Sequence, residues 1–456
     1  MTQAVSGLRS IWQAPYRPLF LLAGLWALVA PIVWIFPEDI APDRGAWHSR
    51  ELSFGMAGAA AGGYLLTALP AWTKKGPVPP GFTIVASCLW CVARLTAALP
   101  EHLPFIAEAI GASAYFAFLT AVLAHGVGSS GAWHRLWAPL ATAALCMNAV
   151  LSLYDGLSPA SRAPLLYIVL ITLIGGRATS AFTRRWLGAR HLHHRDRPTL
   201  SYLAIAAILV AAYFSGTRQQ ISSGLLMTFS GTLLLMQMKE WQSFRTRRYP
   251  ALFILHIAFA WTPAALILSG LAAIFPDWIS PTAALHALTM GAMGTMMAAF
   301  MMRSAMIRDG ETLVLNRTMA CAFSLISLSA LLRILGGWMS GTYLDPIVAA
   351  AICWMTAWAL FLACYLPAMS GAVPKPVFSA AIGSEVVLSS GITTSGGEAM
   401  IAVNQARKEA SHVRRAISKW GLHLGLRRTR RSFRPVQGRL APELQEGSGN
   451  EHGRAR

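Results

Sequence analysis

The sequence predicts an all-α, polytopic integral membrane protein with twelve transmembrane helices and with both termini in the cytoplasm. Three observations support this fold class. Hydrophobic residues make up 55% of the 456 residues and charged residues only 12%, whereas a soluble domain carries about 25% charged residues. Apolar stretches long enough to cross a bilayer, which takes roughly 20 residues, recur along most of the chain. The basic residues are concentrated in every second segment that joins these stretches.

Each apolar stretch ends at a cluster of charged, glycine or proline residues, which sets the bounds of the predicted helix. In chain order the predicted spans are Leu19–Phe36, Glu51–Trp72, Pro80–Leu99, Pro104–Gly126, Leu136–Tyr154, Pro164–Phe182, Thr199–Phe214, Ile221–Met238, Pro250–Phe275, Pro281–Ile307, Val314–Met339 and Pro346–Met369.

The placement of basic residues orients these spans. If the N-terminus is cytoplasmic, the cytoplasmic segments before the tail hold seventeen Lys and Arg residues, and the outer segments hold four, Arg44, Arg50, Arg162 and Arg218. This distribution follows the positive-inside rule through every alternation. The formal net charge of +19 is therefore an orientation signal, and it gives no reason to expect binding to nucleic acid.

Two parts of the chain differ in composition. Residues 1–370 form the predicted transmembrane domain, and all six cysteines lie in its spans, which excludes a secreted disulfide framework. Residues 371–456 are rich in Gly and Ser and hold 14 Lys and Arg against 6 Asp and Glu. We expect a disordered cytoplasmic tail that rests on anionic lipid headgroups.

Charged side chains inside spans are costly and often mark function. Arg94, Arg177 and Arg333 lie within predicted spans. One interpretation is that each extends its guanidinium to the membrane surface. The other is that they bind a buried anion, such as a carboxylate or a phosphate.

Four histidines lie in spans or at their ends: His48, His125, His256 and His286. The predicted topology places His48 and His286 near the outer surface, and His125 and His256 near the cytoplasm. A single membrane histidine is more often hydrogen-bonded within the structure than bound to metal. Several at comparable depths favour metal or haem ligation, because neutral imidazole suits iron, copper and zinc.

The tenth span is rich in methionine, from Met290 to Met306. Thioether sulfur suits cuprous copper. The alternative is that these flexible side chains fill gaps between helices beside small residues such as Gly291 and Gly294.

Four stretches of the chain resemble the NnrS family of haem- and copper-containing bacterial membrane proteins. The resemblance covers about residues 10–370, in order. The matching stretches are Pro15–Leu22, Trp47–Gly55 with Gly63–Thr73, Gly175–Arg177 with Phe182–Leu187, and His256 with Trp261, Ala284–Met296 and Arg303.

The resemblance implies a bacterial inner-membrane protein that binds haem b and copper. It also implies a role in denitrification and in tolerance of nitric oxide. His48, His256 and His286 would be the ligand histidines, with His125 as a further candidate. Arg94, Arg177 and Arg303 would be partners of the haem carboxylates.

The chain departs from the family at one place. Relatives resemble a Gly-His-Thr-Gly-Arg run after the arginine of the tenth span, and this chain reads Ser304-Ala305-Met306-Ile307-Arg308-Asp309-Gly310 instead. The histidine of that run is absent.

Three hypotheses about function follow. The first is a haem- and copper-binding protein that binds or detoxifies nitric oxide, or protects against nitrosative stress. The second is a transporter of copper or of a small anion, suggested by the methionines and the buried arginines. The third is a metal-sensing or assembly partner that acts through the basic tail.

Overall fold

A computed structural model describes most of the first of the two units into which the chain divides, Met1–Gly383. The second unit, Ser384–Arg456, lies outside the described residues, and so does nearly all of the predicted tail. The described residues are 10–37, 43–99, 103–154, 159–192, 195–310, 312–336, 345–371, 373–374 and 376–378.

The described part of the chain is all-α apart from one short β-hairpin, as predicted. Its helices are α2 (Tyr16–Val29), η1 (Ala30–Ile35), α3 (Arg44–Arg50), η2 (Glu51–Met56), α4 (Ala57–Thr73), α5 (Pro80–Ala97), α6 (Phe105–Ser130), η4 (Trp133–Arg135), α7 (Trp137–Leu151), α8 (Pro159–Leu170), η5 (Ile171–Gly176), α9 (Arg177–Gly188), α10 (Pro198–Gly216), α11 (Gln220–Glu240), η6 (Ser243–Arg248), α12 (Pro250–Ile274), α13 (Pro281–His286), η7 (Ala287–Gly294), α14 (Thr295–Ala305), α15 (Arg317–Leu335) and α16 (Pro346–Ala368). The hairpin pairs β1 (Ile307–Asp309) with β2 (Thr312–Val314).

Eleven helices of the described residues are long and apolar enough to cross a membrane. They correspond to eleven of the twelve predicted spans, so the prediction of a multi-pass membrane protein is confirmed. The remaining predicted span, Leu136–Tyr154, contains α7, which has only 15 residues. A helix of that length is about 22 Å long at a rise of 1.5 Å per residue. It is shorter than predicted because η4 ends just before it and Ser152–Tyr154 form a turn after it.

Consecutive helices pair as hairpins around a central group of spans. The pairs α5–α6, α6–α7, α10–α11, α11–α12 and α15–α16 pack side by side, and α2 packs against both α4 and α16. The spans Arg44–Thr73 and Pro281–Ala305 are the most enclosed, with 78% and 72% of their apolar windows buried inside the bundle. Both spans carry a predicted ligand histidine in the short helix at their start, where His48 and His286 are half-buried.

Three of the central spans change from α-helix to π-helix along their length. The π-helical segments are η2, η5 and η7. Each contains glycine, and these glycines allow close packing. A Cβ atom on Gly55 would lie 2.6 Å from Cδ1 of Trp26, and one on Gly291 would lie 2.5 Å from Cε3 of Trp261. Such segments are rare and occur frequently at functional sites.

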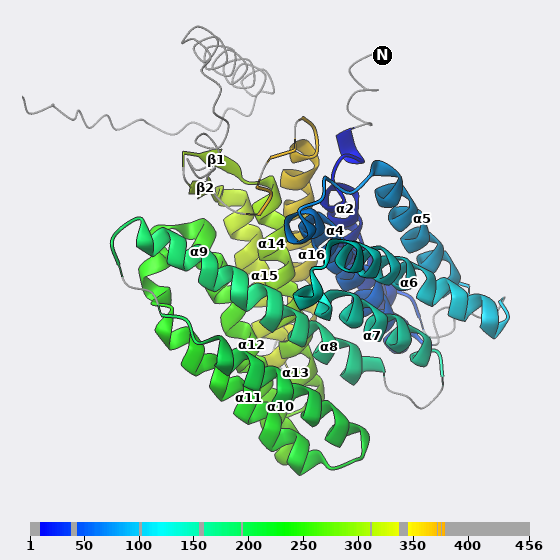
Figure 1. Cartoon of the computed structure of the whole chain (residues 1–456). Coiled ribbons are helices and arrows are strands. Elements are labelled where there is room, and N and C mark those ends of the chain that lie inside the picture. Colours follow the sequence, from blue (N-terminus) through cyan, green and yellow to red (C-terminus); the bar gives the residue numbers. More distant parts are fainter. Residues whose placement is uncertain are drawn as a thin grey trace, which may run out of the picture. The chain divides into compact units, whose positions relative to one another are not determined.

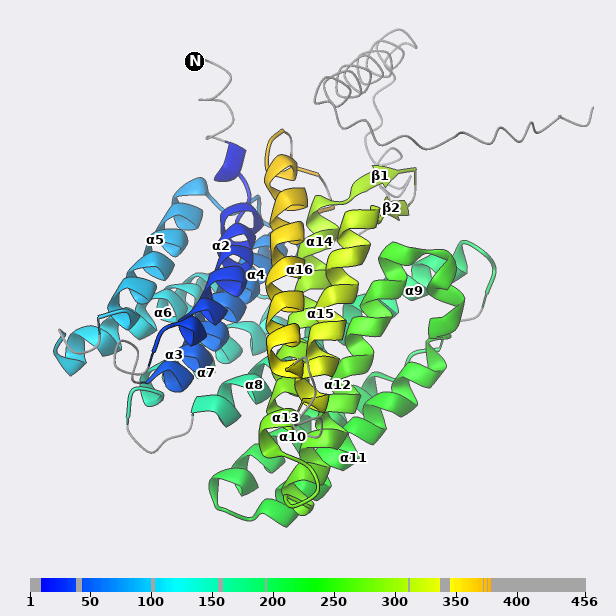
Figure 2. The same cartoon turned by 180° about the vertical axis from the view of Figure 1, so that it is seen from behind.

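The two ends of the bundle differ in structure (Figures 1 and 2). The hairpin β1–β2 lies at one end, which we call the hairpin end, and α3 and α13 lie toward the other, which we call the α3 end. At the hairpin end the buried Arg17 donates to the carbonyl of Ser10 at 2.7 Å and to that of Gly371 at 3.0 Å. These bonds hold the start and the end of the helical bundle together.

Candidate functional site

His48 and His286 lie toward the α3 end of the bundle, on the two most enclosed spans. His48 is in the last turn of α3, and His286 is the last residue of α13. The two imidazoles are close enough to interact electrostatically, and both interact with the guanidinium of Arg333 in α15. The fold therefore brings together two histidines from distant parts of the sequence beside a positive charge.

Each ring of this histidine pair has one nitrogen that could serve as a metal ligand. Nδ1 of His286 lies 2.7 Å from the carbonyl oxygen of Thr282. A carbonyl only accepts, so Nδ1 carries the proton and Nε2 keeps its lone pair. Nδ1 of His48 is buried and has no hydrogen-bond partner among the described residues. The backbone of Ala30 hydrogen-bonds to the same ring, and with Nδ1 unpartnered this bond belongs to Nε2.

Each ring thus has one nitrogen that is hydrogen-bonded to the backbone and a second nitrogen without a hydrogen-bond partner among the described residues. A second hydrogen bond of this kind fixes the tautomer and the orientation of metal-binding histidines. The ring of Trp34 packs edge-on against His48, with centroids 5.7 Å apart, and further restricts that ring.

His256 lies apart from this pair, near the start of α12 and toward the hairpin end. Its Nε2 is 2.7 Å from Oγ1 of Thr183, and its Nδ1 is 2.9 Å from Oγ of Ser243. Because the Thr183 hydroxyl donates to the carbonyl of Thr179, it accepts from Nε2 of His256. Both ring nitrogens therefore have hydroxyl partners, an arrangement typical of a structural histidine.

His125 is exposed near the end of α6 and contacts none of the other three histidines in the described structure. No group of three or more His, Cys, Asp or Glu residues that could hold a metal ion occurs among the described residues. The histidine pair is thus the best metal-binding arrangement in the described part of the chain, and the ligand roles of His256 and His125 stay predictions.

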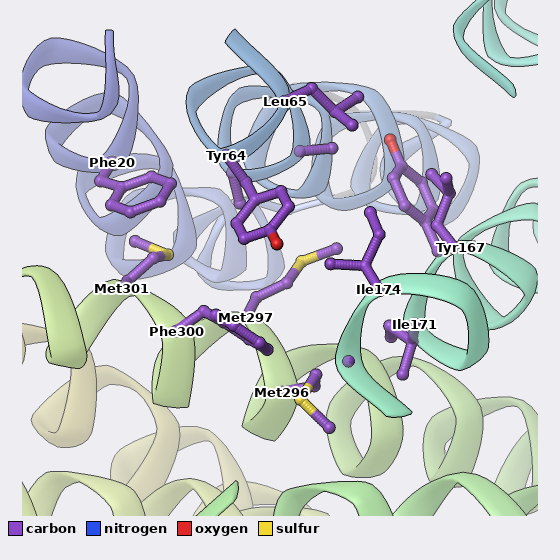
Figure 3. A pocket seen from close by; sticks show the side chains of 14 residues that line it. Phe20, Tyr64, Leu65, Tyr167, Ile171, Ile174, Met296, Met297, Phe300 and Met301 are labelled. Atoms are coloured by element: carbon purple, nitrogen blue, oxygen red, sulfur yellow. The ribbon is translucent and has the colours of Figure 1, made fainter. Parts of the chain in front are cut away.

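A cavity of about 60 Å³ lies in the middle of the bundle, between α2, α4, α8, η5 and α14. Figure 3 shows its aromatic and methionine lining, with Tyr64 on one side and Met296 and Met297 opposite. The methionines of the tenth span thus partly line a cavity and partly fill the core, since Met302 is fully buried and does not line the cavity.

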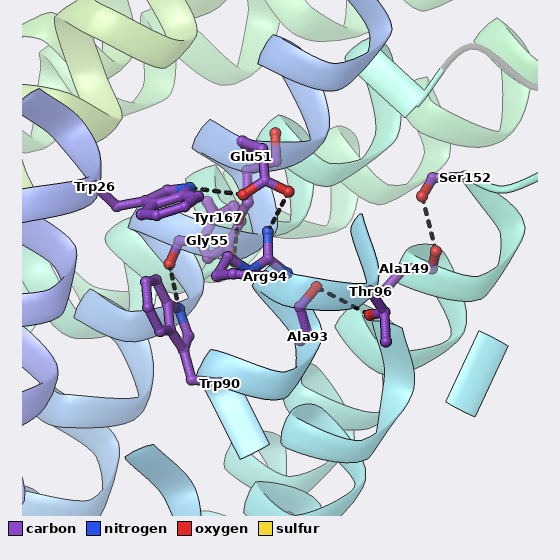
Figure 4. A network of polar contacts seen from close by, with 11 residues as sticks. Trp26, Glu51, Gly55, Trp90, Ala93, Arg94, Thr96, Ala149, Ser152 and Tyr167 are labelled. Atoms are coloured by element: carbon purple, nitrogen blue, oxygen red, sulfur yellow. Dashed lines mark hydrogen bonds and ion pairs between the residues drawn. The ribbon is translucent and has the colours of Figure 1, made fainter. Parts of the chain in front are cut away.

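Arg94 pairs with a carboxylate that the sequence analysis did not select. Its Nη1 donates to Oε1 of Glu51 at 2.6 Å, and the indole nitrogen of Trp26 donates to Oε2 at 2.6 Å (Figure 4). The indole of Trp90 lies beside Arg94 and donates to the carbonyl of Gly55 at 2.9 Å. Glu51 was overlooked because the predicted span began there, whereas the helix begins seven residues earlier, at Arg44.

The other two predicted arginines lie toward the hairpin end. Arg303 is buried and donates to the carbonyl oxygens of Ala251 at 2.5 Å and Phe378 at 2.9 Å. Arg177 is exposed, and its charge interacts with that of Arg135. Burial and then the charge of Arg177 lower the pKa of Arg135. The three arginines are thus not gathered around the histidine pair, and their role as partners of haem carboxylates stays a prediction.

Comparison with known proteins identifies the family. The family model described as NnrS protein matches residues 10–372. The chain belongs to the NnrS family. No curated protein matches it.

Three of the stretches that carry the NnrS resemblance include π-helical segments. Trp47–Gly55 runs from α3 into η2, Gly175–Arg177 crosses from η5 into α9, and Ala284–Met296 contains η7. In this NnrS chain the segment without the family's histidine forms the β1–β2 hairpin, which turns at Gly310 with a φ of +53°.

The histidine pair of this NnrS chain offers ligands that suit copper, and the central cavity is too small for haem. Each of the two imidazoles has a nitrogen that is not hydrogen-bonded within the described structure, and Nδ1 of His48 is buried. Imidazole nitrogens of this kind suit a copper ion. A haem b needs space for a porphyrin, and a single benzene ring already takes a cavity of about 150 Å³. The 60 Å³ cavity is too small for a porphyrin.

Proposed function

We propose that this NnrS protein binds a metal ion, copper in the first place, through His48 and His286, and that the metal site acts in the response to nitric oxide. The site would bind or detoxify nitric oxide, or protect against nitrosative stress. The proposal is supported by two histidines from distant parts of the sequence that lie within electrostatic range of each other, each with one ring nitrogen that has no hydrogen-bond partner among the described residues.

The protein's own residues have separate tasks in this proposal. His48 and His286 would hold the metal, and the carbonyl oxygens of Ala30 and Thr282 orient their rings. Arg333 adds a fixed positive charge that would balance an anionic ligand. The bound metal would supply the position at which nitric oxide coordinates. The haem b that the family resemblance implies stays a further proposal.

The topology belongs to the same proposal. If α7 also crosses the membrane, the chain has twelve spans with both termini in the cytoplasm, and the seventeen-to-four distribution of basic residues fits the bacterial inner membrane. The histidine pair then lies near the outer surface. Single cysteines introduced at Ser152 and at Ser129 test this topology. An impermeant thiol reagent added to intact cells is expected to label only the first, and equal labelling would contradict twelve spans.

The basic tail, residues 371–456, is proposed to be a separate cytoplasmic region that binds anionic lipid headgroups, each basic residue contributing about 1 kcal/mol. Vesicles with and without anionic lipid provide the test. Salt-sensitive binding of the full chain, but not of a chain that ends at residue 383, to anionic vesicles is expected, and equal binding of both would refute the assignment.

Metal content tests the site directly. Copper and iron are quantified in purified wild type and in His48→Ala, His286→Ala, His256→Ala and His125→Ala, and spectra are recorded before and after nitric oxide is added. We expect the first two variants to lose the metal, and the nitric oxide response with it. The last two are expected to keep both. Wild type without copper and iron would refute the proposal, and loss of metal in His256→Ala alone would move the site to α12.

The transporter hypothesis has one observation in its favour, the methionines that line the central cavity. Thioethers bind cuprous copper, but no acidic side chain lines this cavity to balance the charge of an ion. Uptake of labelled copper into proteoliposomes distinguishes the two functions, because a metal site of the proposed kind predicts no flux above that of empty vesicles.

A further inference from the structure

The central cavity has no part in the proposed metal site, and its lining selects a class of ligand. We infer that it is a binding site for a small, uncharged, apolar molecule of the size of a diatomic gas or a xenon atom. The site lies between α2, α4, α8, η5 and α14 (Figure 3). The inference goes beyond the proposed function because it requires neither the histidine pair nor a metal.

The chemistry of the lining excludes ions and disfavours water. Two tyrosines, Tyr64 and Tyr167, are the only lining residues with polar side chains apart from methionine sulfur. The hydroxyl of Tyr167 donates to the carbonyl of Ser53 at 2.7 Å, so it is already engaged. The Tyr64 hydroxyl has no hydrogen-bond partner among the described residues. A buried water molecule needs two to four polar partners, and this cavity offers one.

The volume sets an upper limit on the ligand. The cavity measures about 60 Å³, and an apolar cavity of about 150 Å³ stays dry and takes benzene or xenon. The cavity has less than half of that volume, so it is too small for an aromatic ring but large enough for a monatomic or diatomic molecule. Met296 and Met297 can adjust to the shape of such a ligand, because methionine has three rotatable bonds and a polarisable sulfur.

An aromatic side chain packs against two of the residues that line the cavity. The ring of Phe378 stacks on Tyr64, with centroids 5.0 Å apart and planes at 25°, and it meets Phe300 edge-on at 6.3 Å. Both of these partners line the cavity. Arg303 donates to the carbonyl oxygen of Phe378 at 2.9 Å and so holds this ring in place. The packing of Phe378 thus restricts the movement of two side chains of the lining.

The cavity is distant from the metal site although the same two spans contribute to both. Tyr64 lies 16 residues after His48 on a helical span, which corresponds to about 24 Å at 1.5 Å per residue. An apolar gas that partitions into the bilayer can occupy this space without contact with the histidines. Binding in the cavity and binding at the metal can therefore be measured separately.

Xenon is the probe that tests this inference. Crystals of the full chain are pressurised with xenon, and anomalous scattering locates the bound atoms. We expect a peak inside the cavity in wild type. Ala61→Leu extends a side chain that lines the cavity and is expected to abolish the peak. Ala71→Leu adds the same atoms at an exposed position of α4, so its peak should equal that of wild type.

A second variant keeps the test decisive if Ala61→Leu does not fold. A methyl group on Gly175 would lie 3.2 Å from the thioether of Met296, so Gly175→Ala should lower xenon occupancy without filling the whole cavity. Wild-type crystals that bind xenon elsewhere but not here would overturn the inference, as would a peak that survives both substitutions. Metal content is measured on the same preparations, so failure of the cavity site leaves the metal proposal intact.

Discussion

Removing one member of the buried Glu51–Arg94 pair should lower the free energy of unfolding much more than replacing both members with uncharged side chains. Glu51 is 1% exposed and Arg94 8% exposed, and their closest atoms are 2.6 Å apart. Removing one member of a buried ion pair leaves an uncompensated charge and costs about 3–5 kcal/mol of stability. Replacing both members with uncharged side chains of similar volume often changes the stability little. We therefore expect Arg94→Met to lower the free energy of unfolding by about 3–5 kcal/mol.

Glu51→Gln combined with Arg94→Met should recover more than half of that loss. The glutamine keeps an oxygen that can accept from the indole of Trp26, which donates to Glu51 at 2.6 Å in wild type. The neutral pair also removes the need to bury a carboxylate without a partner. The coupling energy between the two positions should then be much larger than roughly 0.3–0.5 kcal/mol, the deviation from additivity that is usual for distant sites.

Equilibrium unfolding in mixed micelles, followed by tryptophan fluorescence and circular dichroism, measures these free energies. The control is the pair between Arg197 and Glu240, which is 3.3 Å long and has exposed fractions of 41% and 29%. Arg197→Met should cost less than about 1 kcal/mol, as is usual for a surface pair. If the double variant is no more stable than Arg94→Met, or if both arginine variants cost the same, the reasoning is wrong.

Three further predictions concern packing, the cavity and the metal. Gly291→Ala should destabilise the protein by about 1–3 kcal/mol, because the new Cβ would lie 2.5 Å from Trp261, whereas Gly188→Ala, with no atom within 4 Å of its Cβ, should not; equal unfolding midpoints would contradict this. Phe378→Ala should cost about 1–2 kcal/mol, less than the 3–5 kcal/mol of a fully buried phenylalanine, since its ring is half-buried, and the loss should appear in the same unfolding assay. A copper chelator should lower the unfolding temperature of wild type but not of His48→Ala, because a ligand bound at 100 times its Kd stabilises by about 2.7 kcal/mol; an equal decrease in both would argue against a metal at this histidine.

Much of the fold follows from hydropathy and charge alone. The length of each apolar stretch approximates its helix, and α7 alone among the matched helices is too short to cross a membrane by length and composition. The β1–β2 hairpin was not predicted, and it takes Ile307 and Val314 from the ends of two predicted spans. The π-helical segments were not predicted. An extra residue in a helical turn leaves no distinct pattern in a mostly apolar stretch, and it depends on close packing against other helices, as at Gly55 and Trp26.

The candidate site could be predicted only in part. The topology placed His48 and His286 at the same depth, which is a one-dimensional property, and the structure adds that their rings interact. The partners of Arg94 and Arg303 could not be inferred, because Glu51 and Phe378 meet them through the arrangement of helices in three dimensions. Spacing along the chain carries no information about such contacts.

The π-helical segments decide how the central spans respond to a change of chain length. In an α-helix each residue turns the chain by about 100°, and a π-helical turn, closed by an i→i+5 hydrogen bond, holds one residue more than an α-helical turn. Deleting one residue from η7 and letting it re-form as α-helix would therefore leave His286 and Met296 on nearly the same faces of their span. A residue inserted without a new π-helical turn would instead rotate His286 by about 100° relative to Met296, and so separate the metal site from an otherwise unchanged bundle.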